Sequence, residues 1–90
     1  MSEFMVVCTF KEGTDMADVM KVVAAERDAV ATLQAAGTIG VVKLATPQGK
    51  VFIEAHSADI ESARAVIEAL PMAQWWNIEL YPIVPPAPVG

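Results

Sequence analysis

The fold of this chain is decided by the stretch Leu70-Pro71-Met72-Ala73-Gln74-Trp75-Trp76-Asn77-Ile78-Glu79-Leu80. A helical pattern ends there, because proline lacks the backbone N–H that a helix interior needs. Two adjacent tryptophans follow, and each brings a large apolar ring with one polar N–H into the connection. The β-prone residues 77–83 then predict the last strand of the molecule.

Hydrophobic spacing upstream of this joint predicts three more strands and two helices. The region 16–36 contains no Gly or Pro and repeats its apolar residues at helical spacing before Gly37, which predicts one long helix. The expected elements are a strand at 4–10, the helix at 16–36, strands at 38–45 and 51–56 around a turn at 47–50, a helix at 60–70 and the strand at 77–83.

The order β-α-β-β-α-β predicts an α+β, ferredoxin-like fold, with a four-stranded antiparallel sheet and both helices on one face. The first strand is apolar on both sides, with Phe4 and Val6 on one and Met5 and Val7 on the other. An antiparallel face turned to water normally alternates with polar residues. We therefore expect the second face to pack on another sheet, most simply that of an identical subunit.

The length and composition predict one small globular domain. The chain has 90 residues, of which 54% are hydrophobic. A domain of this size folding alone buries only about 60–65% of its unfolded surface, so oligomerisation is expected. We assign residues 1–84 to the domain and residues 85–90, which are rich in proline, to a C-terminal tail.

The charge and cysteine content limit the classes of partner and the cellular location that we expect. The net charge of −5 and the lack of a Lys/Arg cluster argue against nucleic acid and anionic membranes. No apolar run approaches the roughly 20 residues of a membrane span, and the start lacks the basic region of a secretory signal. The single cysteine, Cys8, cannot form an internal disulfide and is compatible with a cytoplasmic location, which we expect.

Two regions carry a family resemblance. One runs from Ile60-Glu61-Ser62-Ala63 through Leu70-Pro71-Met72 to Asn77-Ile78-Glu79-Leu80, and the other joins Ala25-Glu26-Arg27 to Leu33-Gln34-Ala35-Ala36-Gly37-Thr38. Both resemble muconolactone Δ-isomerase-like proteins, over roughly half of the chain. The resemblance implies a dimeric α/β barrel built from the sheets of two ferredoxin-like subunits. It also implies movement of a double bond within a lactone by proton transfer, without metal or cofactor.

The first helix carries the charged candidates. At about 100° per residue, Arg27 falls near the middle of the apolar stripe, with Glu26 at its edge. One interpretation is that Arg27 extends along the sheet toward solvent or pairs with a carboxylate. The other is that Glu26 and Arg27 border a cavity, where they bind an enolate and transfer a proton.

Three further residue types complete the candidate set. His56 is the only histidine and a candidate for proton transfer, although a strand-end histidine is also a common surface residue. Trp75 and Trp76 point to opposite sides in an extended backbone, so we expect one in the core and one, with Met72, in a substrate-binding wall. No metal or cofactor site is expected, because His56 and Cys8 lack metal-ligand spacing and no glycine-rich phosphate loop occurs.

The sequence leaves three functions open. The first is a cofactor-free isomerase acting on a lactone or related carbonyl compound by proton transfer. The second is a cofactor-independent monooxygenase of an aromatic or polyketide-like substrate. The third is a homo-oligomer that binds a small ligand without catalysis.

Overall fold

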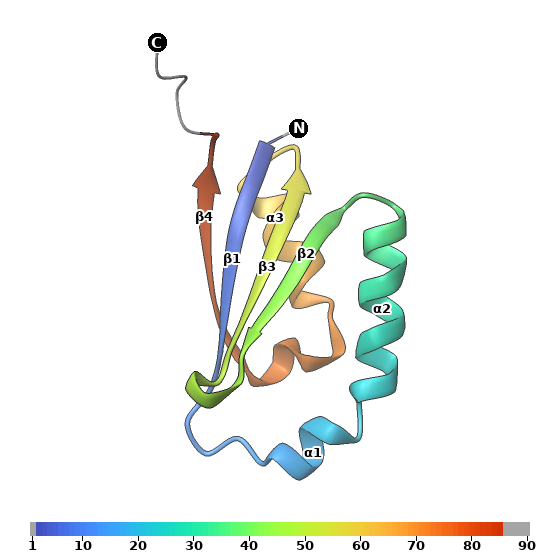
Figure 1. Cartoon of the computed structure of the whole chain (residues 1–90), viewed down its shortest axis with the longest axis vertical. Coiled ribbons are helices and arrows are strands. Elements are labelled where there is room, and N and C mark those ends of the chain that lie inside the picture. Colours follow the sequence, from blue (N-terminus) through green and yellow to red (C-terminus); the bar gives the residue numbers. More distant parts are fainter. Residues whose placement is uncertain (1, 86–90) are drawn as a thin grey trace.

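Four strands pair into one antiparallel sheet in the order β2-β3-β1-β4 (Figure 1). The computed structural model describes residues 2–85, so Pro85 is the only residue of the predicted tail among them. The elements are β1 (Ser2–Phe10), α1 (Met16–Met20), α2 (Val23–Ala35), β2 (Ile39–Ala45), η1 (Thr46–Gln48), β3 (Lys50–Ser57), α3 (Ile60–Glu68), η2 (Pro71–Trp75) and β4 (Trp76–Ile83), where η1 and η2 are 3₁₀ turns.

The predicted α+β class and four-stranded antiparallel sheet are confirmed, and the arrangement is compatible with a ferredoxin-like fold. β1 is central and pairs with β3 on one edge and β4 on the other, so that Val6 lies opposite both Ile53 and Leu80. The predicted hairpin joins β2 to β3 through η1, which ends at Gly49 with a φ of 65°. Glycine adopts this left-handed conformation without the steric cost of a Cβ.

The prediction of one helix over residues 16–36 is wrong, because the structure has two helices there. The amides of Lys21 and Val22 donate to Asp18 and Val19, three residues back, where α-helical bonding reaches four residues back. Val22 departs from helical geometry with φ and ψ of −107° and 7°. The break falls at Val22 and Val23, whose β-branched side chains lower helix propensity, and it follows Val19, which is buried.

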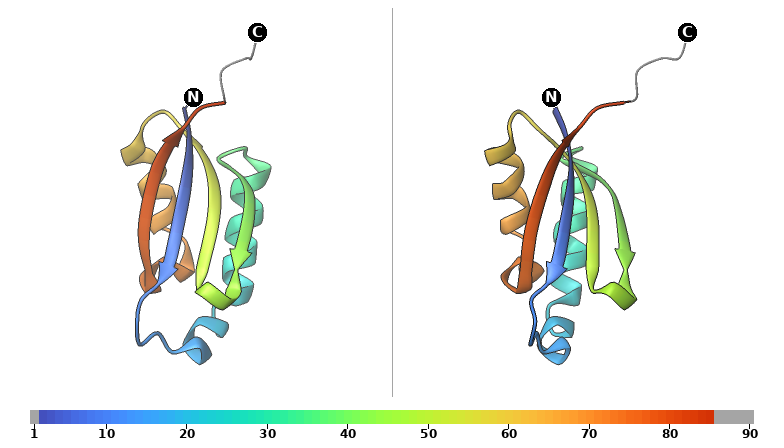
Figure 2. Two further views of the ribbon diagram at one scale, coloured as in Figure 1. Left: turned by 60° about the vertical axis from the view of Figure 1, so that its left-hand side comes forward. Right: turned by 90° about the vertical axis from the view of Figure 1, so that its left-hand side faces the viewer.

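The hydrophobic core lies between the sheet and the helices (Figure 2). The sheet side of the core is formed by alternate residues of β1 and β3 and by the start of β4. The helix α3 packs against them. Phe10 meets Trp76 edge to face, with ring centroids 6.2 Å apart. The central buried residues are Phe4, Val6, Cys8, Ile39, Val51, Ile53, Ala55, Ala63, Ile67, Leu70 and Trp76.

The opposite sheet face, which we call the open face, has no helix over it and faces the viewer in Figure 1. The same registers that place Val6 in the core place Met5, Val7 and Phe52 here. All three are half-buried although only their own sheet contacts them. Polar side chains such as that of Glu79, opposite Val7, surround these residues, so the open face is mixed and carries one short apolar row.

Among residues 2–85, no helix has both the length and the apolar content needed to cross a bilayer.

The core predicts a large difference between two isoleucines of α3. Ile67 is fully buried, whereas Ile60 at the start of the same helix is 37% exposed. We expect Ile67→Ala to lower the free energy of unfolding by about 2–5 kcal/mol, because it leaves a cavity. Ile60→Ala makes the same chemical change and should cost under about 1 kcal/mol. Urea denaturation of both variants checks this, and equal losses would contradict the assignment of the core.

Candidate functional site

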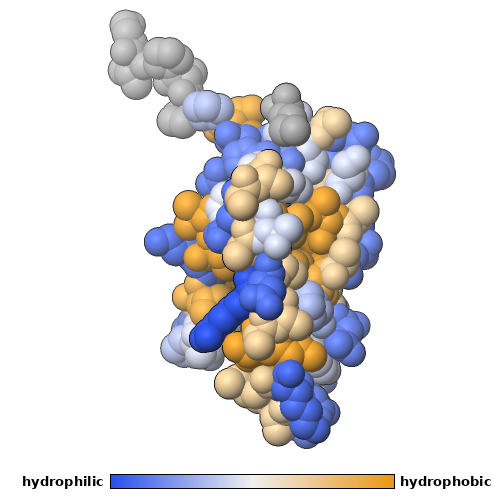
Figure 3. Space-filling model, turned by 90° about the vertical axis from the view of Figure 1, so that its right-hand side faces the viewer, coloured by the Kyte–Doolittle hydropathy of each residue, from blue (hydrophilic) through white to orange (hydrophobic). Residues whose placement is uncertain are grey.

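A large cleft lies between the two N-terminal helices and the helix-side face of β2 and β3. Its volume is about 1030 Å³, enough for a small organic molecule. The turn η1 closes one end of the cleft and η2 contributes Met72. Figure 3 views the molecule from the α2 side, where apolar surface lies between hydrophilic side chains. The apolar wall includes Val19, Val23, Val30, Val42, Met72 and Trp76.

Glu26 is the buried acid of this cleft. It lies in the first turn of α2 with 9% of its surface exposed. Its Oε1 accepts a hydrogen bond of 2.9 Å from the backbone N–H of Met72. Burial raises the pKa of the Glu26 carboxyl, and the Met72 hydrogen bond opposes that rise in part. Ionisation of a carboxyl group is unfavourable close to apolar surface. Its carboxylate form is therefore a stronger base and is suited to accept a proton from a substrate.

The partner of Glu26 comes from the joint between α3 and β4. Pro71 holds the preceding Leu70 in an extended conformation, with ψ of 142°, which ends the helical path. The short turn η2 then starts, and the first N–H groups of any helical turn lack an internal acceptor. One of these, on Met72, meets the Glu26 carboxylate 46 residues away in sequence.

Arg27 lines the same cleft from its solvent side. The prediction that Arg27 lies near the middle of the apolar stripe is wrong, because the Arg27 side chain is exposed and it is the preceding Glu26 that is buried. The ion pairs found among residues 2–85 involve Lys21 and His56 and leave Arg27 without a carboxylate partner. The guanidinium is therefore placed to meet a negative charge that enters from solvent.

The two tryptophans have different positions. Trp76 is 4% exposed and belongs both to the core and to the cleft wall. Its indole N–H is buried and has no hydrogen-bond acceptor within residues 2–85. Trp75 is half-buried outside the set of residues that line the cleft, and its backbone carbonyl accepts from the amide of Lys11. The structure thus brings Glu26, Arg27, Met72 and Trp76 together.

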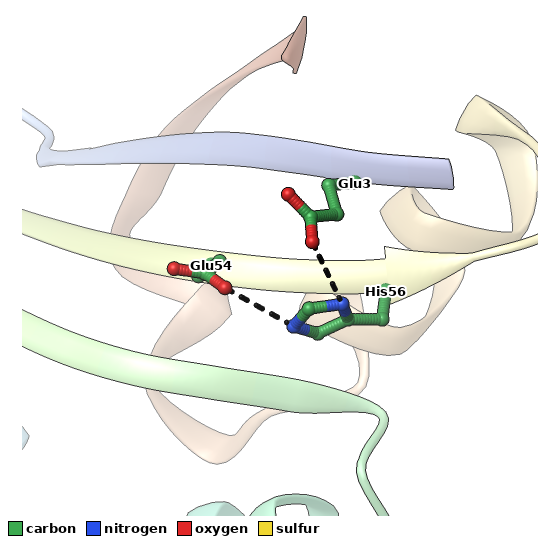
Figure 4. A group of neighbouring side chains, drawn as sticks. All are labelled: Glu3, Glu54 and His56. Atoms are coloured by element: carbon green, nitrogen blue, oxygen red, sulfur yellow. Dashed lines mark ion pairs between the residues drawn. The ribbon is translucent and has the colours of Figure 1, made fainter. Parts of the chain in front are cut away.

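His56 lies on the open face, across the sheet from Glu26. β3 alternates strictly, so Val51 and Ile53 face the helices while Glu54 and His56 face away. Figure 4 shows the His56 ring between two carboxylates, with Nε2 at 3.3 Å from Glu54 and Nδ1 at 3.9 Å from Glu3. The sequence pattern groups Glu54 with His56, as observed, but it cannot say which face of the sheet they share.

Cys8 lies in β1 beneath the cleft. Burial, followed by the negative charge of Glu26, raises the pKa of the Cys8 thiol to about 12. The thiol is therefore protonated at neutral pH and acts as a small apolar group. Sequence reasoning missed the contact between Glu26 and Met72, because a backbone N–H leaves no signature in residue type.

The muconolactone isomerase resemblance rests on the residues quoted above, because a comparison with protein-family models finds no match and a comparison with curated proteins finds none either.

Proposed function

We propose that the cleft holds an unsaturated lactone or related carbonyl compound and isomerises it by proton transfer, without a cofactor. The observation that carries this proposal is the buried Glu26 carboxylate in the wall of an apolar cavity. The family resemblance of residues 25–27 and 33–38 supports it, since it covers the same helix.

In the proposed reaction, the ionised Glu26 removes a proton from the saturated carbon at one end of the conjugated carbonyl system. The C–H bond breaks, an O–H bond forms on Glu26, and the electron pair moves into a conjugated enolate. Glu26 then returns the proton to the carbon at the far end of the conjugated system, which shifts the double bond. Oε1 is bound by Met72, so Oε2 is the oxygen assigned to proton transfer.

Two other groups have assigned roles in this proposal. The guanidinium of Arg27, which has no carboxylate partner within residues 2–85, stabilises the negative charge that develops on the substrate oxygen. The indole N–H of Trp76 lacks an acceptor within residues 2–85. In the proposal it donates a hydrogen bond to a carbonyl oxygen of the same substrate. Burial of Glu26 assists the proton transfer, because a raised pKa makes the carboxylate a stronger base.

A second candidate is a protein that binds a small apolar ligand without catalysis. The observation that favours it is the exposed apolar side of the cleft, where Met16 and Met20 are 50% and 64% exposed. Flexible methionines around a broad opening are typical of sites that accept varied ligands.

We further propose that a second copy of the chain covers the open face, as in a dimeric α/β barrel. The support is the half-buried row of Met5, Val7 and Phe52 on a face without helices. Packing identical faces by a two-fold axis would bury this row on both copies.

Activity is tested on a panel of muconolactones and other unsaturated lactones, with products identified by mass spectrometry and NMR. We expect Glu26→Gln to lower kcat by about 10²-fold or more, because it removes the base. Asp28→Asn removes a neighbouring exposed carboxylate and should leave kcat unchanged. Oxygen uptake would instead indicate a monooxygenase. Saturable binding with no product would indicate the ligand-binding candidate, and an active Glu26→Gln variant would remove Glu26 from the mechanism.

The raised pKa of Glu26 predicts a pH dependence of stability. A carboxyl group whose pKa is higher in the folded than in the unfolded state stays protonated to a higher pH when the protein is folded. The free energy of unfolding therefore falls as pH rises through the interval between the two pKa values. Glu26→Gln cannot titrate, so its unfolding free energy should decline less than that of the wild type between acid and neutral pH. Parallel urea titrations across this range check it, and identical pH slopes would refute it.

The proposed dimer is tested by a charge on the open face. Val7→Lys places a lysine opposite Glu79 of the same sheet, where it is tolerated in the subunit but opposes apolar packing between copies. We expect the dimer to dissociate, as measured by sedimentation, while circular dichroism stays unchanged. Val84→Lys alters a residue that is 85% exposed and should leave the dimer intact. A wild-type monomer at all concentrations would overturn the proposal.

A further inference from the structure

A second group of reactive side chains lies on the open face, away from the cleft. Glu3 stands directly opposite His56 in the β1–β3 register, and Glu54 lies two residues before His56 on the same face of β3. Figure 4 shows both carboxylates directed toward the imidazole ring. One donor atom from each residue lies within 4.8 Å of the other two. Regular strand pairing thus brings together an imidazole and two carboxylates that are far apart in sequence.

The spacing of two donors already suits a metal ion. His56 Nε2 and Glu54 Oε1 are 3.3 Å apart. Two ligands of one tetrahedral zinc ion, with bonds of about 2.0–2.2 Å, stand about 3.3–3.5 Å from each other. Glu3 lies nearer the other ring nitrogen, Nδ1, at 3.9 Å, and its side chain is 46% exposed, so it has the freedom to turn toward an ion held at Nε2.

The neighbouring strand leaves room beside these donors. Gly40 of β2 lies next to them, and a Cβ at this position would stand 3.3 Å from His56 Nε2 and 3.4 Å from Glu54 Oε1. The backbone of Gly40 is held by the side chain of Gln34, which donates to its carbonyl at 3.0 Å. The absence of a side chain here keeps the approach to Nε2 and Oε1 open.

The local charge also favours a cation. Within residues 2–85, neither Glu3 nor Glu54 pairs with a lysine or arginine, and their only ionic contacts are with His56. An imidazole with two carboxylates is a donor set for divalent first-row metals such as zinc, cobalt and manganese. Magnesium and calcium prefer sites in which all ligands are oxygen atoms.

We propose that Glu3, Glu54 and His56 form a binding site for one divalent transition-metal ion on the open face. His56 supplies Nε2, each glutamate supplies a carboxylate oxygen, and water completes the coordination shell. The site is independent of the reaction proposed for Glu26, because Glu26 lies on the other side of the sheet. The metal site shares the open face with Met5, which is opposite Glu54, so the second copy proposed for this face would lie beside the bound ion. This metal site could not be predicted from sequence spacing, because Glu3 is 53 positions from His56 and only strand pairing brings them together. The prediction of no metal site rested on the spacing of histidine and cysteine alone.

The test is a zinc titration of the tag-free, full-length protein by calorimetry, with NMR of the imidazole protons. His56 is the only histidine, so its resonances report the site without overlap. We expect one zinc ion per chain with micromolar affinity and a shift of the His56 resonances. His56→Ala should abolish binding, and Glu54→Gln and Glu3→Gln should each weaken it by about tenfold or more.

Two controls make the test specific. Glu61→Gln removes the same charge from an exposed position in α3 and should leave the affinity unchanged. Gly40→Ala keeps every ligand but fills the space beside Nε2, and should weaken zinc binding. The proposal is overturned if millimolar zinc does not bind, if binding survives His56→Ala in a folded protein, or if magnesium binds as tightly as zinc.

Discussion

The two-residue period of β1 and β3 is the constraint on which the rest of this structure depends. These central strands pair along their whole length, so every side chain is committed to one face of the sheet. One face carries Cys8 and Val51 into the core and under the cleft, and the other carries Glu3, Glu54 and His56. A shift of one residue in this pairing would exchange the two sets and destroy both the core and the carboxylate–imidazole cluster.

The cleft places a charged group where the fold would otherwise be apolar. Burying a carboxylate is unfavourable unless a donor compensates it, and Glu26 has one backbone donor, the N–H of Met72. The compensation is incomplete, which is why burial still raises the pKa of Glu26. Burial, together with the negative charge of Glu26, raises the pKa of the Cys8 thiol and keeps it protonated. Such a carboxylate is a poor contributor to stability and a good one to proton transfer.

Much of the fold could be predicted from the sequence, because strand and helix periods are local properties. The element order and the hairpin around Gly49 followed from alternation and turn residues. The break after Met20 did not, since no Gly or Pro marks it and the adjacent valines, Val22 and Val23, lower helix propensity without forbidding a helix. In the candidate site, helical spacing placed Arg27 near the middle of the apolar stripe and Glu26 at its edge, whereas the structure buries Glu26 and exposes Arg27. His56 could not be assigned to a face, because alternation fixes which residues share a face and not which face it is.

Trp76 has a consequence for how this protein can diverge. It is a wall shared by the core and the cleft, so reshaping the cleft from this side also disturbs the packing against Phe10. On the opposite wall of the cleft, Leu44 of β2 is 68% exposed and Met16 and Met20 border solvent, so these side chains line the cleft without belonging to the core. New ligand preferences can therefore arise by substitution of Met16, Met20 and Leu44 at little cost to folding, whereas substitution of Trp76 also costs stability.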